Sequence, residues 1–199
     1  MPFLNLAEWA SGVNTLGPGS RTVIWVQGCL QRCPGCYSPE WQPVCPALLV
    51  DPMECARIIT ERTSDCGLTV SGGEPMLQAA GLLQMWHSVK KMRNDWTLLL
   101  FSGYYHSQLL KENHPDKVAL VQAADAFVGG PYVAALNDGR GIRGSTNKEI
   151  WVPEGSRFSP EDVCFMAAGL RDVEYRERAY GTLAIGVPKP NAYQMDKGS

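Results

Sequence analysis

Long apolar runs and secretion signals are both missing from this chain of 199 residues. A membrane-spanning helix needs roughly 18–20 consecutive apolar residues, and no run approaches that length. The first residues also lack the basic and apolar regions of a signal peptide. We therefore expect a cytoplasmic protein that has no contact with a membrane.

A charge of one sign is equally scarce, since the formal net charge is only −2. Basic residues are scattered, whereas nucleic-acid binders gather them on one face, so we expect no nucleic-acid partner. The seven cysteines are an odd number and lack the spacing of a disulfide scaffold. In a reducing compartment they stay thiols, and those that cluster then point to metal binding.

Three cysteines do cluster, in the segment GCLQRCPGCY. Cys29, Cys33 and Cys36 lie on one short loop with two glycines and a proline, so their sulfurs can converge on one inorganic centre. Structural zinc sites take four protein ligands, whereas three thiolates on a four-iron cluster leave one iron open to another molecule. A zinc site completed by Cys45 or by a histidine remains the alternative.

Apolar and β-branched segments alternate with helical patterns along the chain, which predicts an α/β fold with a mostly parallel sheet of about five or six strands. The cysteine loop follows a buried strand at residues 21–27. Further strands are predicted at 67–73, 96–103, 125–130 and 148–153, and helices at 52–64, 75–94, 106–113, 116–124 and 159–169. A closed (β/α) barrel usually needs about 250 residues, so we expect a partial barrel.

The last part of the chain follows another pattern. Residues 172–178 and 180–188 alternate with period two, which predicts a C-terminal β extension made of a strand pair. The charged run from Arg171 to Arg178 is expected to be a solvated face. No linker divides the chain, so we expect one domain over residues 1–199, with a core at about 14–152 and the extension at about 153–199.

Two motifs together carry a resemblance to a known family. CLQRCPGC, followed by SGGEP at residues 71–75, resembles the radical S-adenosylmethionine (SAM) superfamily. GPGSR at 17–21, SGY at 102–104 and RGSTN at 143–147 resemble, in this order, the activating proteins of anaerobic ribonucleotide reductases, a small glycyl-radical activase group. The resemblance covers roughly residues 14–152.

The resemblance implies a [4Fe-4S] cluster held by Cys29, Cys33 and Cys36, with SAM bound at the open iron. Reductive cleavage of SAM would give methionine and a 5′-deoxyadenosyl radical. We assign no catalytic side chain, because cluster and SAM carry the chemistry. Glu74 is expected to face the methionyl amine, and Arg143 the carboxylate. The residues expected to bind SAM are Tyr37, Ser71, Gly72, Gly73, Glu74, Ser102, Arg143, Ser145 and Asn147.

An open barrel side admits a large substrate, so we expect the radical to take hydrogen from a protein or peptide. The favoured function is an activase that generates a glycyl radical in a partner enzyme. The alternative is a maturase that modifies, rearranges or excises backbone of a ribosomally synthesised precursor peptide. A third hypothesis is a non-enzymatic iron–sulfur or zinc protein. The radical hypotheses require an electron donor such as flavodoxin or ferredoxin, and they leave room for an accessory protein.

Overall fold

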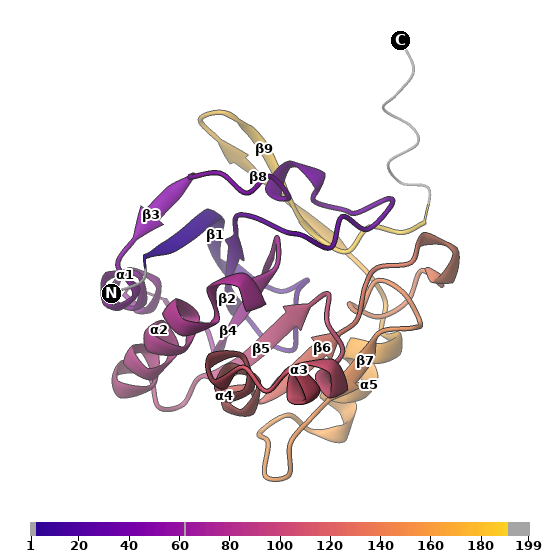
Figure 1. Cartoon of the computed structure of the whole chain (residues 1–199). Helices are drawn as coiled ribbons and strands as arrows, with labels where there is room; N and C mark the ends of the chain where they lie inside the picture. Colours follow the sequence, from indigo (N-terminus) through magenta and orange to yellow (C-terminus); the bar gives the residue numbers. More distant parts are fainter. Residues whose placement is uncertain (1–2, 62, 191–199) are drawn as a thin grey trace.

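Seven strands form one sheet in the order β3-β1-β2-β4-β5-β6-β7 in the computed structural model, which describes residues 3–61 and 63–190 (Figure 1). The strands are β1 (Leu4–Val13), β2 (Arg21–Val26), β3 (Leu48–Val50), β4 (Gly67–Gly72), β5 (Thr97–Ser102), β6 (Ala126–Gly129) and β7 (Glu149–Trp151). The helices are α1 (Pro52–Thr60), α2 (Ala79–Met92), α3 (His106–Glu112), α4 (Pro115–Ala123) and α5 (Pro160–Ala168).

The centre of the sheet is parallel, as the sequence predicts. β2, β4, β5 and β6 pair side by side in parallel, while β1, β3 and β7 add antiparallel pairings at its two sides. The α/β class is therefore confirmed. The count of five or six strands was too low, because β1 and β3 were not predicted, and the strand at 148–153 was expected to be parallel but is antiparallel.

One face of the sheet is covered by helices. Ile24, Leu68 and Leu98 on neighbouring strands join a buried cluster with Leu82 of α2 and Leu120 of α4, and Figure 1 shows α1 to α4 gathered on this side. No helix within the described part of the chain is both long and apolar enough to cross a membrane. Burial of the parallel strands explains why they read as near-continuous apolar runs.

The opposite face is covered by later parts of the chain. Leu99 and Val128 pack against Met166 of α5. Val23 and Trp25 of β2 pack instead against Ile185, which belongs to a separate two-stranded sheet of β8 (Val173–Arg178) and β9 (Gly181–Gly186). The predicted C-terminal strand pair is confirmed.

Charged side chains of β8 attach this pair to the first strand. The Glu174 carboxylate accepts hydrogen bonds from the backbone N–H groups of Asn14 (2.7 Å) and Thr15 (3.0 Å), and Arg176 donates to the carbonyl of Gly12 at 2.7 Å. Part of this run thus contacts protein rather than water. The prediction that the whole run is a solvated face was wrong, because the carbonyl and N–H groups that it meets lie more than 150 residues away in the sequence.

Arg21 ties together the amino ends of three parallel strands, on the edge opposite the cysteine loop. Its side chain is fully buried and donates to the Thr69 hydroxyl at 2.7 Å, to the Leu68 carbonyl at 2.7 Å and to the Thr97 carbonyl at 3.0 Å. Burial lowers its pKa to about 10, so the guanidinium stays charged at neutral pH. The arginine of the GPGSR motif thus has a structural role.

We expect Arg21→Met to lower the free energy of unfolding by about 3 kcal/mol, because the methionine leaves buried carbonyl and hydroxyl groups without donors. Urea denaturation under reducing conditions measures the change. Arg57→Met is the control, since Arg57 pairs with Glu54 on an exposed helix surface and its loss should leave the midpoint nearly unchanged. Equal losses in the two variants would contradict the structural role of Arg21.

Asp65 closes the same end of the fold. Its carboxylate accepts hydrogen bonds from the Ser20 hydroxyl at 2.6 Å, the Thr22 hydroxyl at 2.7 Å and the Gly12 N–H at 3.0 Å. Burial raises the pKa of Asp65, but these hydrogen bonds outweigh burial and hold the pKa below its ordinary value. The ionised form is therefore the one that stabilises the folded state.

A carboxylate with a depressed pKa contributes stability above its unfolded pKa of about 3.9, and that stability is lost as the pH falls through the folded value. We expect Asp65→Asn to cost about 2 kcal/mol at pH 7, since the amide nitrogen cannot accept these hydrogen bonds. The variant should also lose stability less steeply than the wild type below about pH 4. Parallel slopes in urea titrations across this range would contradict the assignment.

Candidate functional site

The candidate site lies at the carboxyl edge of the parallel strands, where ligands bind in open α/β sheets. β2 ends at Val26 and leads into the cysteine loop, β4 ends at Gly72 within the SGGE turn, and β5 ends at Ser102. Val26 pairs directly with Gly72. Segments that are far apart in the sequence therefore meet at one edge.

A tight turn brings two of the three thiols together. The Cys36 N–H donates to the Cys33 carbonyl at 3.1 Å, so Cys33 to Cys36 form a four-residue turn with Pro34 and Gly35 at its centre. Gly35 has φ +74°, and proline followed by a glycine with positive φ is the signature of a type II turn. The spacing of Cys33 and Cys36 is therefore built into the backbone.

The first thiol is held by the other end of the same loop. The Cys29 N–H donates to the Gln42 carbonyl at 2.9 Å. This hydrogen bond fixes the backbone of Cys29 shortly after the end of β2. Burial raises the pKa of the Cys29 thiol, and hydrogen bonds from the backbone of Gln31 and Arg32 act in the opposite direction. Cys29, Cys33 and Cys36 are all free and half-buried. Backbone donors of this kind suit the sulfurs of an iron–sulfur cluster.

A four-iron cluster and a single zinc ion place different demands on the three sulfurs. Within residues 3–61 and 63–190, no three His, Cys, Asp or Glu side chains are grouped to hold one metal ion. Each thiolate of a [4Fe-4S] cluster binds its own iron, so the three sulfurs need not converge on one atom. Cys45 is exposed, and its thiol lies 3.8 Å from the carbonyl of Pro43.

The glycines of the SGGE turn allow it to pack against the cysteine loop. Gly73 donates to the Val26 carbonyl at 2.7 Å, and Glu74 donates to the Gly28 carbonyl at 2.8 Å. A Cβ on Gly73 would lie 2.3 Å from the Gly28 oxygen, a separation that real Cβ atoms do not reach. Gly72 adopts φ +107°, which also favours glycine. The two motifs are thus in backbone contact.

Glu74 is buried within this contact rather than open to a ligand. Its carboxylate accepts hydrogen bonds from the Ser102 hydroxyl (2.8 Å), the Gly103 N–H (2.7 Å) and the Met76 N–H (2.9 Å). Burial raises its pKa, and these three donors oppose the shift. Glu74 and Ser102 therefore join the ends of β4 and β5, and their predicted contacts with SAM stay predictions.

A pocket of about 380 Å³ opens beside these segments. Five of the predicted site residues line it, namely Cys36, Tyr37, Ser71, Gly72 and Arg143. The other predicted residues lie outside its wall. They are Cys29, Cys33, Gly73, Glu74, Ser102, Ser145 and Asn147.

The RGSTN segment has two buried polar atoms without a partner, one on a residue of the pocket wall and one on a residue outside it. Arg143 Nε and Asn147 Oδ1 are buried without a hydrogen-bond partner among the described residues, although each side chain makes other contacts through its remaining atoms. Buried polar atoms rarely stay unpaired, so a donor and an acceptor here suit a polar ligand. The Ser145 hydroxyl, in contrast, is fully buried and accepts from the Val133 N–H at 3.3 Å.

Lys148 lines the pocket and was not predicted. Burial lowers the pKa of its ammonium below the ordinary value, and nearby Glu74, Cys33 and Cys36 oppose this shift without cancelling it. A negative charge bound beside Lys148 would favour its charged form. Its place directly after the RGSTN segment was the signal available in the sequence.

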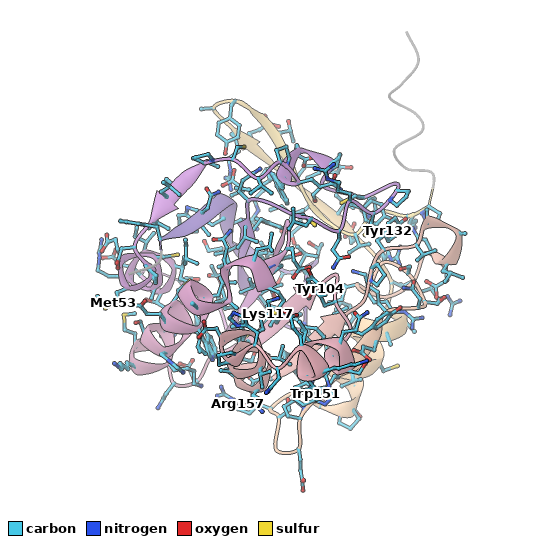
Figure 2. All side chains as sticks on the ribbon, in the orientation of Figure 1. Met53, Tyr104, Lys117, Tyr132, Trp151 and Arg157 are labelled. Atoms are coloured by element: carbon cyan, nitrogen blue, oxygen red, sulfur yellow. The ribbon has the colours of Figure 1, made fainter. Side chains whose placement is uncertain are left out.

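Tyr37 leads from the last cysteine to the far wall of the pocket. Its ring packs against Tyr132 with centroids 4.9 Å apart, and the Tyr132 hydroxyl donates to the Tyr37 oxygen at 3.2 Å. The amide of Asn137 donates to both hydroxyls. Tyr132 is labelled in Figure 2. Tyr37 is therefore fixed by side chains that come about 100 residues later.

Comparison with known proteins agrees with this geometry. Residues 15–151 match the family described as "4Fe-4S single cluster domain". The chain belongs to this family. It is 33% identical over 141 residues to the anaerobic ribonucleoside-triphosphate reductase-activating protein of Vibrio cholerae, an alignment that covers 67% of this chain and 88% of that protein. The protein of the same name from Escherichia coli K12 is 27% identical over 146 residues, covering 67% and 89%.

A different activating enzyme matches a shorter stretch. The pyruvate formate-lyase-activating enzyme of Staphylococcus epidermidis is 39% identical over 80 residues, which cover 37% of this chain and 32% of that protein. The chain is thus a 4Fe-4S single cluster protein of the radical SAM type, similar to enzymes named as activases. Residues 152–199 lie outside the family match.

Proposed function

We propose that this chain is an activating enzyme that uses a [4Fe-4S] cluster and SAM to generate a glycyl radical in a partner protein. The observation that carries the proposal is the pocket between the cysteine loop, the SGGE turn and Arg143. The names of the relatives support the class of reaction. The whole of residues 1–199 would act as one unit, with a core at about 14–152 and a C-terminal extension.

Cys29, Cys33 and Cys36 would hold the cluster, and SAM would occupy the neighbouring pocket. When bound, the cluster supplies one electron that cleaves SAM and so generates the radical that removes a hydrogen atom. Arg143 offers a guanidinium for the carboxylate of SAM. Asn147 lies outside the pocket wall, so its amide oxygen would accept from a hydroxyl or amine of SAM where the ligand extends beyond the pocket. Lys148 would offset the negative charge of the thiolates.

Aromatic side chains would keep water away from this reaction. Trp25 and Trp41 line the pocket, and their ring centroids lie 5.5 Å apart. Phe101 lines it as well. Excluding water protects a reactive radical from quenching and strengthens the electrostatic contacts inside the site. Tyr37 would cover the cluster from the other side.

A protein substrate fits an open sheet. Among the described residues, β3 and β7 are the two ends of the sheet and do not pair with one another, so we propose that the strands act as a partial (β/α) barrel with an accessible side. The enzyme would need a reductant such as flavodoxin or ferredoxin, and an accessory protein fits the same scheme. A peptide maturase with the same cofactors is the alternative.

The test is anaerobic reconstitution followed by reaction with the candidate substrate encoded next to this chain. We expect about four irons per chain and no zinc, and 5′-deoxyadenosine when dithionite and SAM are added. A glycyl-radical signal in a large partner enzyme would support the activase. A mass change in a short peptide would support the maturase instead. One zinc per chain without iron would overturn both.

A further inference from the structure

The C-terminal extension forms part of the pocket wall, although it lies outside the family match. Val173 and Tyr175 of β8 and Leu183 of β9 line the pocket together with Pro188. The matched region ends at residue 151. A pocket that opens at the carboxyl edge of the parallel strands is therefore completed by a segment that the family match does not include.

Arg171 lies in this extension, just before β8, and its side chain binds the loop of residues 137–144, which carries Arg143. Its side chain is 1% exposed. Nε donates to the Gly141 carbonyl at 2.6 Å, and Nη2 donates to the carbonyls of Arg140 (2.7 Å) and Gly144 (3.2 Å). The prediction that Arg171 belongs to a solvated face was wrong. Three of its contacts are instead with backbone carbonyls on both sides of Arg143.

The same guanidinium reaches the cysteine loop through one side chain. Nη1 of Arg171 donates to Asn137 Oδ1 at 2.7 Å, and the amide nitrogen of Asn137 donates to the hydroxyl of Tyr37. Tyr37 directly follows Cys36, the last of the three clustered thiols. Tyr37 also donates to the Pro188 carbonyl at 3.3 Å, which Arg171 contacts at the same distance.

The loop of residues 137–144 needs such a restraint because its glycines can adopt many backbone conformations. Gly139, Gly141 and Gly144 adopt φ of +73°, +60° and +88°, and glycine backbones of this kind lose much entropy when they are ordered. Asp138 lies 3.7 Å from Arg171 Nη2 and 3.3 Å from Arg143 Nη2. The carboxylate thus offsets the charge of both arginines.

We propose that Arg171 is a positioning residue for the ligand pocket. It would hold residues 137–144 so that Arg143, through its unpaired Nε, meets the ligand, and would link this loop to Tyr37 beside the cluster. The inference rests on the proposed function for the identity of the ligand, SAM. It goes beyond that function because it makes the C-terminal extension necessary for binding.

Equilibrium dialysis of SAM against the reconstituted protein with an oxidised cluster measures binding without cleavage. We expect Arg171→Gln to raise the Kd for SAM roughly 10-fold or more, by analogy with the loss of residues that orient the direct ligands of a metal. The iron content should stay unchanged. The matched control is Arg157→Gln, since Arg157 also lies in the extension but donates to the backbone carbonyls of Asn94 and Asp95, just before β5 and at the end of the sheet away from the pocket. Its Kd should stay within about twofold of the wild type.

Amide hydrogen exchange of residues 137–144 gives a second readout that does not depend on SAM. Exchange there should be faster by about tenfold in Arg171→Gln and unchanged in Arg157→Gln. A Kd in Arg171→Gln within twofold of the wild type, or an equal loss in Arg157→Gln, would overturn the positioning role. A wild type that does not bind SAM, with the exchange pattern as expected, would overturn the proposed function and the ligand named here.

Discussion

Cys33→Ser protein is expected to form no detectable 5′-deoxyadenosine when it is incubated anaerobically with SAM and dithionite. Cys33 begins the turn whose N–H to carbonyl bond at 3.1 Å closes on Cys36, and it is one of three half-buried free thiols on one loop. A cluster left with two thiolates is held too weakly to survive. Iron analysis and product chromatography on the same sample measure both effects.

Cys45→Ser is the control, because Cys45 is close in sequence but exposed. It should keep its iron and form the product at the rate of the wild type. Loss of product in both variants would mean that Cys45 is a ligand, and the assignment of an open iron would fail. Full activity in Cys33→Ser would remove the cysteine loop from the mechanism.

Gly73→Ala is expected to lower both stability and SAM cleavage. The new methyl group would meet the Gly28 oxygen at 2.3 Å, the Gly28 carbonyl carbon at 2.7 Å and the Trp41 oxygen at 2.9 Å. All three are backbone atoms, so the SGGE turn and the cysteine loop must move apart. We expect a loss of about 1–3 kcal/mol in unfolding free energy and about a 100-fold lower cleavage rate from a shift of about 1 Å.

Gly155→Ala is the matched control for this change. A Cβ at Gly155 would meet no heavy atom within 4 Å, although its φ of +79° favours glycine. Only backbone strain is then added, and it costs about 1 kcal/mol. Urea denaturation and single-turnover product formation compare the two variants. A Gly73→Ala enzyme that cleaves SAM as fast as Gly155→Ala would contradict the close packing of the two motifs.

The central strands and the helix α1 could be predicted from the sequence, because short local patterns determine them. The buried strands at the sheet centre and the helix that begins after Asp51 follow from apolar runs and from a capping residue, whose carboxylate accepts from Met53 and Glu54. β1 was missed because register shifts between Leu6 and Glu8 and between Ala10 and Val13 break the alternation that marks a strand. β3 has only three residues.

In the candidate site, too, some residues could be predicted from local motifs and others could not. The cysteine loop and the SGGE turn are short motifs, so their residue spacing alone identifies them as candidates. Lys148 and Arg171 depend on which distant groups the fold places around them, and no local pattern distinguishes a buried arginine from a solvated one. The burial of Glu74 behind Ser102 likewise required the register of β4 and β5.

In the mechanism proposed here, three cysteines bind a cluster and leave one iron open for SAM. Electron paramagnetic resonance of the reduced, reconstituted protein tests it most directly when spectra are recorded with and without SAM. We expect SAM to change the signal of the cluster, and isotopically labelled nitrogen in the methionyl amine to give a measurable coupling. A signal that SAM leaves unchanged, from an iron already bound to a side chain, would contradict it.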